Sequence, residues 1–380
     1  MARSSMRAAA AGGLLALALA LPAPAAATPA GRGPASAQAL GLGTMVWGVD
    51  AISARNAWAV GETSSGGLIA HWNGTAWSQN HSLSTASGLF AVSADSASDV
   101  WAAGDGLIAH WNGSAWSQAA TPRGVLLGVA ALSPSDVWAV GRHCVSDCSH
   151  APVWHALIMH WNGSVWSAVA EPNPGQADVL RSVSVDSPAD AWAVGYSADS
   201  LNAGPQLPLL LHWNGAAWSQ VAAPQSVPTP AYLAGVVAVS GTDAWAVGSY
   251  CSDDPFDCAN RITPDTGTLA LHWNGTAWSR VRLPSTAAHQ NGLGSVSSVA
   301  AKDVWTVGSD DLSRNLAEQW NGTAWKVVPT PAASGSDGLA SVSARSVRDA
   351  WAVGWHYPPN SQVRPLIEHW NGTAWSIKVS

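Results

Sequence analysis

The chain has 380 residues, of which 47% are hydrophobic and only 11% are charged, and its formal net charge is −7. An average domain has about 25% charged residues, and this chain has no cluster of Lys or Arg, so nucleic acid and anionic membranes are poor candidate partners. Trp is unusually frequent, with 24 residues against 2 Phe and 4 Tyr. The abundance of Ala and the scarcity of Lys indicate a GC-rich, actinobacterium-like source.

Residues 1–27 are predicted to form a signal peptide. Arg3 and Arg7 give a positive start, an apolar run of Ala, Gly and Leu follows, and small residues up to Ala27 provide a cleavage site. The apolar run is too short to span a membrane, so we expect the mature protein to be secreted and extracellular. Residues 28–42 are rich in Ala, Gly and Pro and are predicted to be a flexible lead-in. Residues 43–380 carry the folded domain.

The folded domain consists of one sequence unit that recurs seven times, and this repeat decides the fold. The first signature of the unit is Asp-Ala/Val-Trp-Ala-Val-Gly, and its Trp residues are Trp58, Trp101, Trp138, Trp192, Trp245, Trp305 and Trp351. The second signature is His-Trp-Asn-Gly-Thr-Ala-Trp-Ser, centred on Asn73, Asn112, Asn162, Asn214, Asn274, Asn321 and Asn371. Three Trp per unit account for 21 of the 24.

Each unit is predicted to form four short strands. In the fifth unit these are residues 236–240, 244–248, 269–273 and 276–281. The Asn-Gly pair between the last two strands favours a two-residue type I′ hairpin, which would place Trp273 opposite Thr276. Strict alternation in the first strand of the seventh unit would place Leu339 and Ser341 on one face and Val342 on the other.

A single sheet of this kind cannot bury both of its faces, whereas seven sheets in a ring cover one another's Trp-rich faces. An open stack would need atypical capping repeats, and neither end departs from the pattern. The sequence therefore predicts an all-β fold, a seven-bladed β-propeller with four antiparallel strands per blade.

The repeats resemble those of secreted bacterial tandem-repeat β-propellers, and their style is similar to kelch, WD-repeat and Asp-box blades. The Gly-Gly pair of kelch repeats and the Ser-x-Asp-x-Gly order of the Asp-box are missing. Because this fold hosts many activities, the resemblance implies architecture and not function. The likeness to WD-repeat blades implies a structural Asp–His hydrogen bond within blades, with the pairs Asp99–His110, Asp136–His160, Asp190–His212, Asp243–His272 and Asp349–His369. Asn56 replaces the Asp in the first blade, and Gln319 replaces the His in the sixth.

The repeated His residues are spread around the ring, so we interpret them as structural, and we expect neither a metal nor a cofactor. The Asn-Gly-Thr/Ser sequons are interpreted as turn residues, because Asn214-Gly215-Ala216 occupies the same turn without a hydroxyl residue.

Four cysteines in two equivalent loops predict the local disulfides Cys144–Cys148 and Cys251–Cys258. Two metal alternatives stay open. One is a zinc site formed by Cys144 and Cys148 with His143, His150 or His155. The other is a calcium site formed by Asp253, Asp254 and Asp257.

The functional face is predicted from loop variation. The loops between the second and third strands and between blades share one rim and vary greatly, whereas the turns on the opposite rim are short and uniform, so we place any site on the variable rim near the central opening. The candidate ligand-binding residues are Tyr196, Tyr250, Arg261, Arg314, Trp355, His356 and Tyr357.

Two functions compete for this rim. The first is a monomeric binding module for a glycan, a peptide or a cell-envelope component, since Trp and Tyr on rigid loops offer flat apolar faces. The alternative is an extracellular carbohydrate-active enzyme, either a glycoside hydrolase, which needs a carboxylate pair, or a polysaccharide lyase. The scarcity of charged residues favours binding, and no catalytic residue is assigned.

Overall fold

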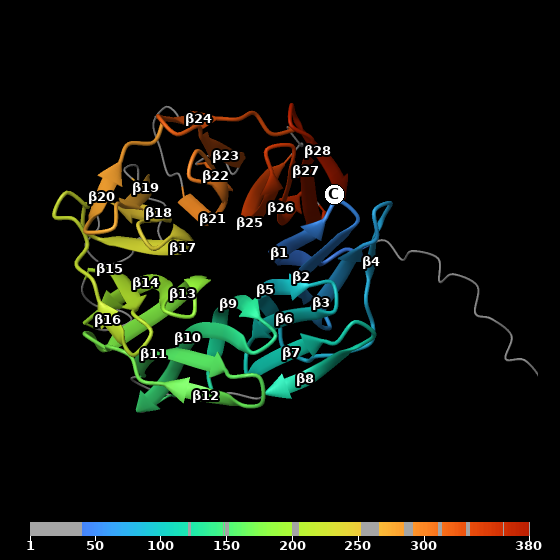
Figure 1. Cartoon of the computed structure of the whole chain (residues 1–380). Helices are drawn as coiled ribbons and strands as arrows, with labels where there is room; N and C mark the ends of the chain where they lie inside the picture. Colours follow the sequence, from blue (N-terminus) through green and yellow to red (C-terminus); the bar gives the residue numbers. More distant parts are fainter. Residues whose placement is uncertain are drawn as a thin grey trace, which may run out of the picture. The chain divides into compact units, whose positions relative to one another are not determined.

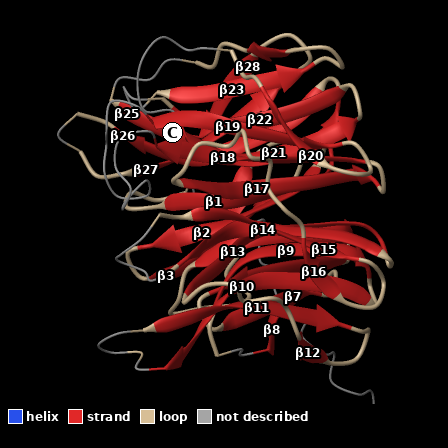
Figure 2. Cartoon of the chain, turned by 90° about the vertical axis from the view of Figure 1, so that its left-hand side faces the viewer, coloured by secondary structure: helices blue, strands red, loops and turns tan. Residues whose placement is uncertain are grey.

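The computed structural model describes residues 40–120, 123–146, 148, 152–199, 205–251, 266–284, 292–310, 314–331, 335–359 and 361–379. The predicted signal peptide and most of the predicted lead-in lie outside these residues. Leu40, near the end of that lead-in, is buried among residues of the first and last blades. All regular structure among the described residues is β-strand (Figure 2). None of these residues forms a helix long and apolar enough to cross a membrane.

Twenty-eight strands, assigned in chain order, make up seven blades of four strands in the described part of the chain. Blades 1 to 4 are β1 (Met45–Ser53), β2 (Asn56–Thr63), β3 (Gly66–Trp72) and β4 (Trp77–Gln79); β5 (Leu89–Ser96), β6 (Asp99–Gly104), β7 (Leu107–Trp111) and β8 (Trp116–Ala120); β9 (Val125–Ser133), β10 (Asp136–Ser146), β11 (Val153–Trp161) and β12 (Trp166–Val169); β13 (Ala177–Ser187), β14 (Asp190–Ala198), β15 (Leu207–Trp213) and β16 (Trp218–Gln220).

Blades 5 to 7 are β17 (Ala231–Ser240), β18 (Asp243–Cys251), β19 (Thr266–Trp273) and β20 (Trp278–Val281); β21 (Gly292–Ala300), β22 (Asp303–Ser309), β23 (Asn315–Trp320) and β24 (Trp325–Val327); β25 (Ser336–Ser346), β26 (Asp349–Tyr357), β27 (Arg364–Trp370) and β28 (Trp375–Val379).

The blades form a ring with the first strand of each blade nearest the centre (Figure 1). Neighbouring strands within a blade are antiparallel. Blades 3 and 4 merge into one eight-stranded sheet, because a parallel bridge joins Trp154 to Ala177 and the Trp154 amide donates to the Gln176 carbonyl at 3.0 Å. The predicted seven-bladed β-propeller is therefore confirmed.

The ring closes through side chains of β25 that accept hydrogen bonds from the backbone of β1. The Val49 amide donates to Ser341 Oγ at 3.4 Å, and the Ala51 amide donates to Ser343 Oγ at 3.1 Å. Ser343 Oγ in turn donates to Asp50 Oδ1 at 3.0 Å. Residues almost 300 positions apart thus join the last blade to the first.

Tryptophan packing between blades holds the ring together. The indole of each second strand contacts both hairpin indoles of the following blade, as Trp192 of blade 4 does with Trp273 and Trp278 of blade 5, at centroid distances of 5.0 and 4.9 Å. Trp351 of blade 7 contacts Trp72 and Trp77 of blade 1 at 5.0 and 5.3 Å. These buried aromatic contacts each contribute roughly 0.5–1.5 kcal/mol beyond the burial of apolar area. The expectation that neighbouring blades cover each other's tryptophans is confirmed.

The predicted Asp–His pairs are present in all five blades that have both residues. Nε2 of His110, His160, His212, His272 and His369 lies 2.5 to 2.9 Å from Oδ1 of Asp99, Asp136, Asp190, Asp243 and Asp349 respectively. The other two blades have an equivalent hydrogen bond. In blade 1, where Asn56 replaces the Asp, His71 Nε2 lies 2.9 Å from Asn56 Oδ1. In blade 6, where Gln319 replaces the His, Gln319 donates to Asp303 Oδ1 at 2.8 Å.

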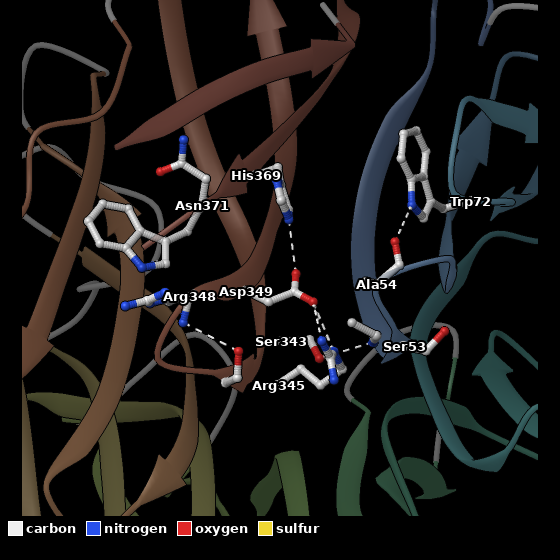
Figure 3. Close-up of polar contacts among 12 residues, drawn as sticks. Ser53, Ala54, Trp72, Ser343, Arg345, Arg348, Asp349, His369 and Asn371 are labelled. Atoms are coloured by element: carbon white, nitrogen blue, oxygen red, sulfur yellow. Dashed lines mark hydrogen bonds and ion pairs between the residues drawn. The ribbon is translucent and has the colours of Figure 1, made fainter. Parts of the chain in front are cut away.

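Each Asp–His pair supports the tryptophan packing, because the imidazole also lies against the second-strand indole of its own blade. The Trp101–His110 centroid distance, for example, is 4.1 Å. In blade 7, Asp349 lies between His369 and Arg345 (Figure 3). Nearby, the Trp72 indole of blade 1 donates to the Ala54 carbonyl at 3.1 Å (Figure 3).

The predicted hairpin register is wrong. Trp273 pairs directly with Trp278 and His272 with Ser279, so the turn has four residues instead of two. Asn274 Oδ1 accepts hydrogen bonds from the amides of Thr276 and Ala277, both at 3.0 Å. The Asn side chain therefore caps a longer turn, while the following glycine takes a positive φ of 91°.

Candidate functional site

Every innermost strand contains a β-bulge at the same place. In blade 4, Leu180 pairs with Gly195 and Ser182 with Val194, so Arg181 between them has no partner residue. The other blades repeat this shift in pairing register. The seven unpaired residues, called here the bulge ring, are Trp47, Phe90, Leu127, Arg181, Ala234, Gly294 and Ala340.

The glycine that ends the Trp-Ala-Val-Gly signature makes the bulge possible. A Cβ on Gly195 would lie 1.9 Å from the Val179 carbonyl oxygen, and a Cβ on Gly248 would lie 2.0 Å from the Tyr232 carbonyl oxygen. Only glycine tolerates so close an approach of backbone. The bulge also corrects the predicted alternation in blade 7, because Leu339 and Val342 pack in the same core cluster.

Two connected hollows meet at the bulge ring. The first is a central channel of about 370 Å³ lined by the seven innermost strands, and the second is a cavity of about 440 Å³, called here the mouth cavity. Among the described residues, those that line both hollows are the seven of the bulge ring. The mouth cavity is lined by residues near the starts of these strands, which is the rim predicted to carry function.

The bulge ring is asymmetric, and this asymmetry shapes the mouth cavity. Blades 1 to 4 contribute large side chains, whereas blades 5 to 7 contribute Ala234, Gly294 and Ala340. The remaining lining residues all come from blades 5 to 7 and are Tyr232, Gly292, Leu293, Gly308, Ser309, Leu339 and Trp355. The hollow therefore lies over the three blades with small bulge residues.

Aromatic side chains form much of the wall of the mouth cavity. Trp355 of β26 contacts Trp47 of β1 at a centroid distance of 5.5 Å, and Phe90 and Tyr232 belong to the lining as well. An apolar concave surface with few polar groups is the usual character of a small-ligand site.

Arg181 is the single charged residue among the described residues that line the mouth cavity. Its guanidinium lies 5.2 Å from the centroid of the Tyr232 ring and 5.8 Å from that of Tyr196, within the range of cation–π attraction. In the described part of the chain Arg181 forms no ion pair, and its buried Nε has no hydrogen-bond partner.

Asp50 is a charged residue that lines the channel and not the mouth cavity. Both of its carboxylate oxygens accept hydrogen bonds from the protein. Asp50 Oδ2 accepts a hydrogen bond from the Ala94 amide at 2.8 Å, and Oδ1 accepts one from Ser343 Oγ at 3.0 Å. Burial raises the pKa of this carboxyl, although these hydrogen bonds oppose the shift. Asp50 therefore links blades 1, 2 and 7 by hydrogen bonds, and its role is structural.

Two further buried carboxyls lie outside both hollows. Glu318 and Glu368 are 1% and 0% exposed and occupy third-strand positions where blades 4 and 5 have Leu211 and Leu271. Burial raises the pKa of each to about 8. Asn315 donates to Glu368 Oε1 at 2.8 Å, and one oxygen of each Glu has no partner within the described residues.

Of the predicted ligand-binding residues, the mouth cavity includes Trp355 alone among those described. Tyr196 is 7% exposed and lies against Arg181, and His356 is 7% exposed and is hydrogen-bonded to Asp337. Buried side chains of this kind offer little surface to a ligand. Tyr357 is 40% exposed and lies outside the lining.

The remaining candidates lie away from the mouth cavity or outside the described residues. Tyr250 is covered by Arg280, whose guanidinium lies 4.8 Å from the ring centroid. Arg314 forms an ion pair with Asp310 at 2.7 Å. Arg261 lies outside the described residues, and neither Tyr250 nor Arg314 lines the mouth cavity.

The first predicted disulfide is present, and it rules out the zinc site proposed at the same cysteines. Cys144 and Cys148 are joined by an S–S bond, so no thiolate is left to bind zinc. Cys251 is disulfide-bonded as well, while its predicted partner Cys258 lies outside the described residues. Within the described ranges no group of three or more His, Cys, Asp or Glu residues is arranged to hold a metal ion. The calcium alternative falls on residues that are not described.

The sequence reasoning missed the bulge ring, although a signal for it exists. Aligning the seven innermost strands on the residue before the bulge places Trp47, Phe90, Leu127 and Arg181 at one position with Ala234, Gly294 and Ala340. This position varies in size and charge within strands that otherwise repeat.

No family model and no curated protein matches the chain significantly. Solved structures do match it over most of its length. YCF48 bound to a D1 peptide is 15% identical, with 90% of this chain and 99% of that chain covered and a TM-score of 0.55. The WD40 β-propeller domain of Doa1 is 14% identical, with 87% and 95% covered and a TM-score of 0.56. Hydrazine synthase of Kuenenia stuttgartiensis is 9% identical, with 84% and 95% covered and a TM-score of 0.56. At these identities the likeness shows a shared β-propeller fold.

Proposed function

We propose that this protein is a secreted binding module that holds a peptide segment with apolar side chains in the mouth cavity. The observation that carries the proposal is the off-axis hollow of about 440 Å³, walled by aromatic residues and placed over the blades with small bulge residues. A preformed concave apolar surface binds ligands with little loss of conformational entropy. Secretion is supported by the Cys144–Cys148 disulfide, since disulfides persist in oxidising compartments.

The polar groups of the lining favour a peptide over a glycan. Sugar hydroxyls need several hydrogen-bonding side chains, because each buried hydroxyl without a partner costs free energy. Apart from the indole N–H groups of Trp47 and Trp355, the polar side chains in the described lining are Arg181, Tyr232 and Ser309. Apolar peptide side chains need few polar partners and gain from contact with Trp and Phe.

The enzymatic alternative has less support at this site. The described lining residues include no Asp, Glu or His that could act as an acid, a base or a nucleophile. Burial raises the pKa of Glu318 and Glu368 to about 8, but both carboxyls lie outside the lining.

An array of immobilised apolar peptides, probed with the purified protein and followed by calorimetry of the tightest binder, tests the proposal. We expect Phe90→Ala and Trp355→Ala each to weaken binding about tenfold or more, because each removes an aromatic wall of the cavity. Tyr357→Ala is the matched control, since it lies two residues from Trp355, is exposed and does not line the cavity. Its affinity should stay at the wild-type value, and all three variants should remain folded in a thermal unfolding measurement.

Two results would contradict the proposal. One is an array on which no peptide binds. The other is tight binding that survives the double variant Phe90→Ala/Trp355→Ala in a protein that is still folded. A glycan array probed in parallel decides whether sugars occupy the site instead.

A further inference from the structure

Arg181 is the one charged residue of the bulge ring. The six equivalent bulge residues are Trp, Phe, Leu, Ala, Gly and Ala. A guanidinium on a half-buried, apolar wall loses part of its hydration and is stabilised only when an anion or several acceptors replace the water. The protein supplies neither among its described residues.

The protein does hold the guanidinium in place. Tyr232 and Tyr196 lie against it at centroid distances of 5.2 and 5.8 Å. Tyr196 is itself 7% exposed, so its ring is fixed by packing. Stacking of this kind orients the planar group, and hydrogen bonds to a guanidinium are made at its edges and not at its stacked faces.

The shape of the site selects the part of a ligand that can reach Arg181. The bulge ring lies where the mouth cavity meets the channel, and the innermost strands surround the centre of the ring (Figure 1). A chain end can point from the mouth cavity into the channel, whereas the middle of a polymer would have to fold back on itself. A peptide has one chain end that is a carboxylate, and a carboxylate matches the fork of a guanidinium with two parallel hydrogen bonds.

We propose that the mouth cavity binds the free C-terminus of a peptide, with the terminal carboxylate on Arg181 and the preceding apolar side chains on Phe90 and Trp355. This inference rests on the proposed function, because it names the part of the peptide that the cavity recognises. Asp50 does not compete for Arg181 in the structure, since its two oxygens are bound by Ala94 and Ser343.

The test compares the same apolar hexapeptides in two forms, one with a free C-terminal carboxylate and one with a C-terminal amide, by calorimetry with the wild-type protein. We expect the amide to bind about 10- to 100-fold more weakly, the range for loss of a charge-assisted hydrogen-bond pair. Arg181→Met should weaken the free acid to the level of the amide and leave the amide unchanged. Arg181→Lys should retain part of the preference for the acid.

Arg142→Met is the matched control. Arg142 also lies over an indole, at 4.6 Å from the Trp154 centroid, and its Nε is buried without a partner, but it does not line the mouth cavity. Its preference for the free acid should equal that of the wild-type protein.

The outcomes separate this inference from the proposed function. Equal binding of acid and amide, with Phe90→Ala still harmful, overturns the role of the carboxylate and leaves the peptide site standing. Absence of binding in both forms overturns both. Binding of an oligouronate that depends on Arg181, with no binding of either peptide form, assigns the cation to an acidic sugar and overturns the peptide.

Discussion

The outer tryptophan shell and the inner bulge ring are built from the same seven repeats, yet they differ in how strictly each position is kept. Every blade supplies three indoles to the shell, and each second-strand indole contacts the hairpin pair of the next blade. The bulge ring ranges from Gly294 to Trp47 with one charge at Arg181. The uniform tryptophan packing closes the ring of blades. The bulge-ring residues take no part in that packing, so they can differ from blade to blade and shape a site.

This contrast separates stability from recognition. A change in the shell should lower the free energy of unfolding of the whole ring, because the blades support one another as nearest neighbours. A change in the bulge ring should alter the cavity and leave the indole contacts of the shell in place.

Trp192→Ala should have the largest effect. Trp192 is fully buried and contacts His212, Trp273 and Trp278, so truncation leaves a cavity between blades 4 and 5. We expect the free energy of unfolding to fall by about 3–5 kcal/mol, measured by urea denaturation. A loss below 1 kcal/mol would mean that the shell does not hold the ring together.

The buried glutamates should give the protein a pH-dependent stability. Burial raises the pKa of Glu318 and Glu368 from 4.5 to about 8. The folded state therefore holds protons that the unfolded state releases between these values. The contribution of these two groups to the free energy of unfolding should be largest below pH 4.5 and should be lost progressively as the pH rises to about 8.

Denaturation of Glu318→Gln and Glu368→Gln at pH 5, 7 and 9 checks this dependence. Each variant should be more stable than the wild-type protein at pH 9 and show a flatter profile, because Gln needs no proton to stay neutral. Asp186→Asn, at an exposed position, is the control and should leave the profile unchanged. A wild-type stability that rises between pH 5 and 8 would contradict the account.

Asp243→Ala should have an intermediate effect. Asp243 Oδ1 accepts the hydrogen bond from His272, and His272 lies against Trp245 at a centroid distance of 4.4 Å. Removing the acceptor leaves a half-buried imidazole without its partner, which costs about 1–3 kcal/mol. Asp243→Asn keeps an acceptor oxygen, as Asn56 does in blade 1, and should lose less in the same urea measurement.

Removal of the Cys144–Cys148 disulfide should have the smallest effect. The bridge closes a loop with a sequence separation of only 4, and the chain-entropy model gives at most about 2 kcal/mol for so short a loop. The double variant Cys144→Ser/Cys148→Ser, measured by thermal unfolding, should keep the peptide affinity of the wild-type protein. A loss as large as that of Trp192→Ala would show that this loop supports the ring.

The comparison also explains which features could be predicted from the sequence. Closure of seven blades follows from the two signatures that recur seven times in the sequence. The Asp–His pairs were expected from the resemblance to WD-repeat blades, although the separation of the two residues varies from 11 to 29 positions. The hairpin register was missed because the Asn274 side chain accepts two backbone amides and lengthens the turn. His356 and Tyr196 were expected on the rim, but β26 and β14 continue past the repeat signature and bury them.

The mouth cavity itself could not be predicted from the repeat signatures. It depends on residues such as Arg181 and Phe90, which differ from blade to blade, and on the bulge that turns them into the channel entrance. A bulge breaks the alternation from which faces are assigned. Its traces in the sequence are the glycine that ends the first signature and the variable position in the aligned innermost strands.

The most direct test of the account fills the hollow without touching the shell. Ala340 and Ala234 are small bulge-ring residues that line the mouth cavity, so Ala340→Phe and Ala234→Phe would occupy the space proposed for the ligand. Calorimetry with the tightest-binding apolar peptide should show that the double variant, folded with an unfolding midpoint near that of the wild-type protein, no longer binds. Wild-type affinity in the filled protein would show that the ligand lies elsewhere.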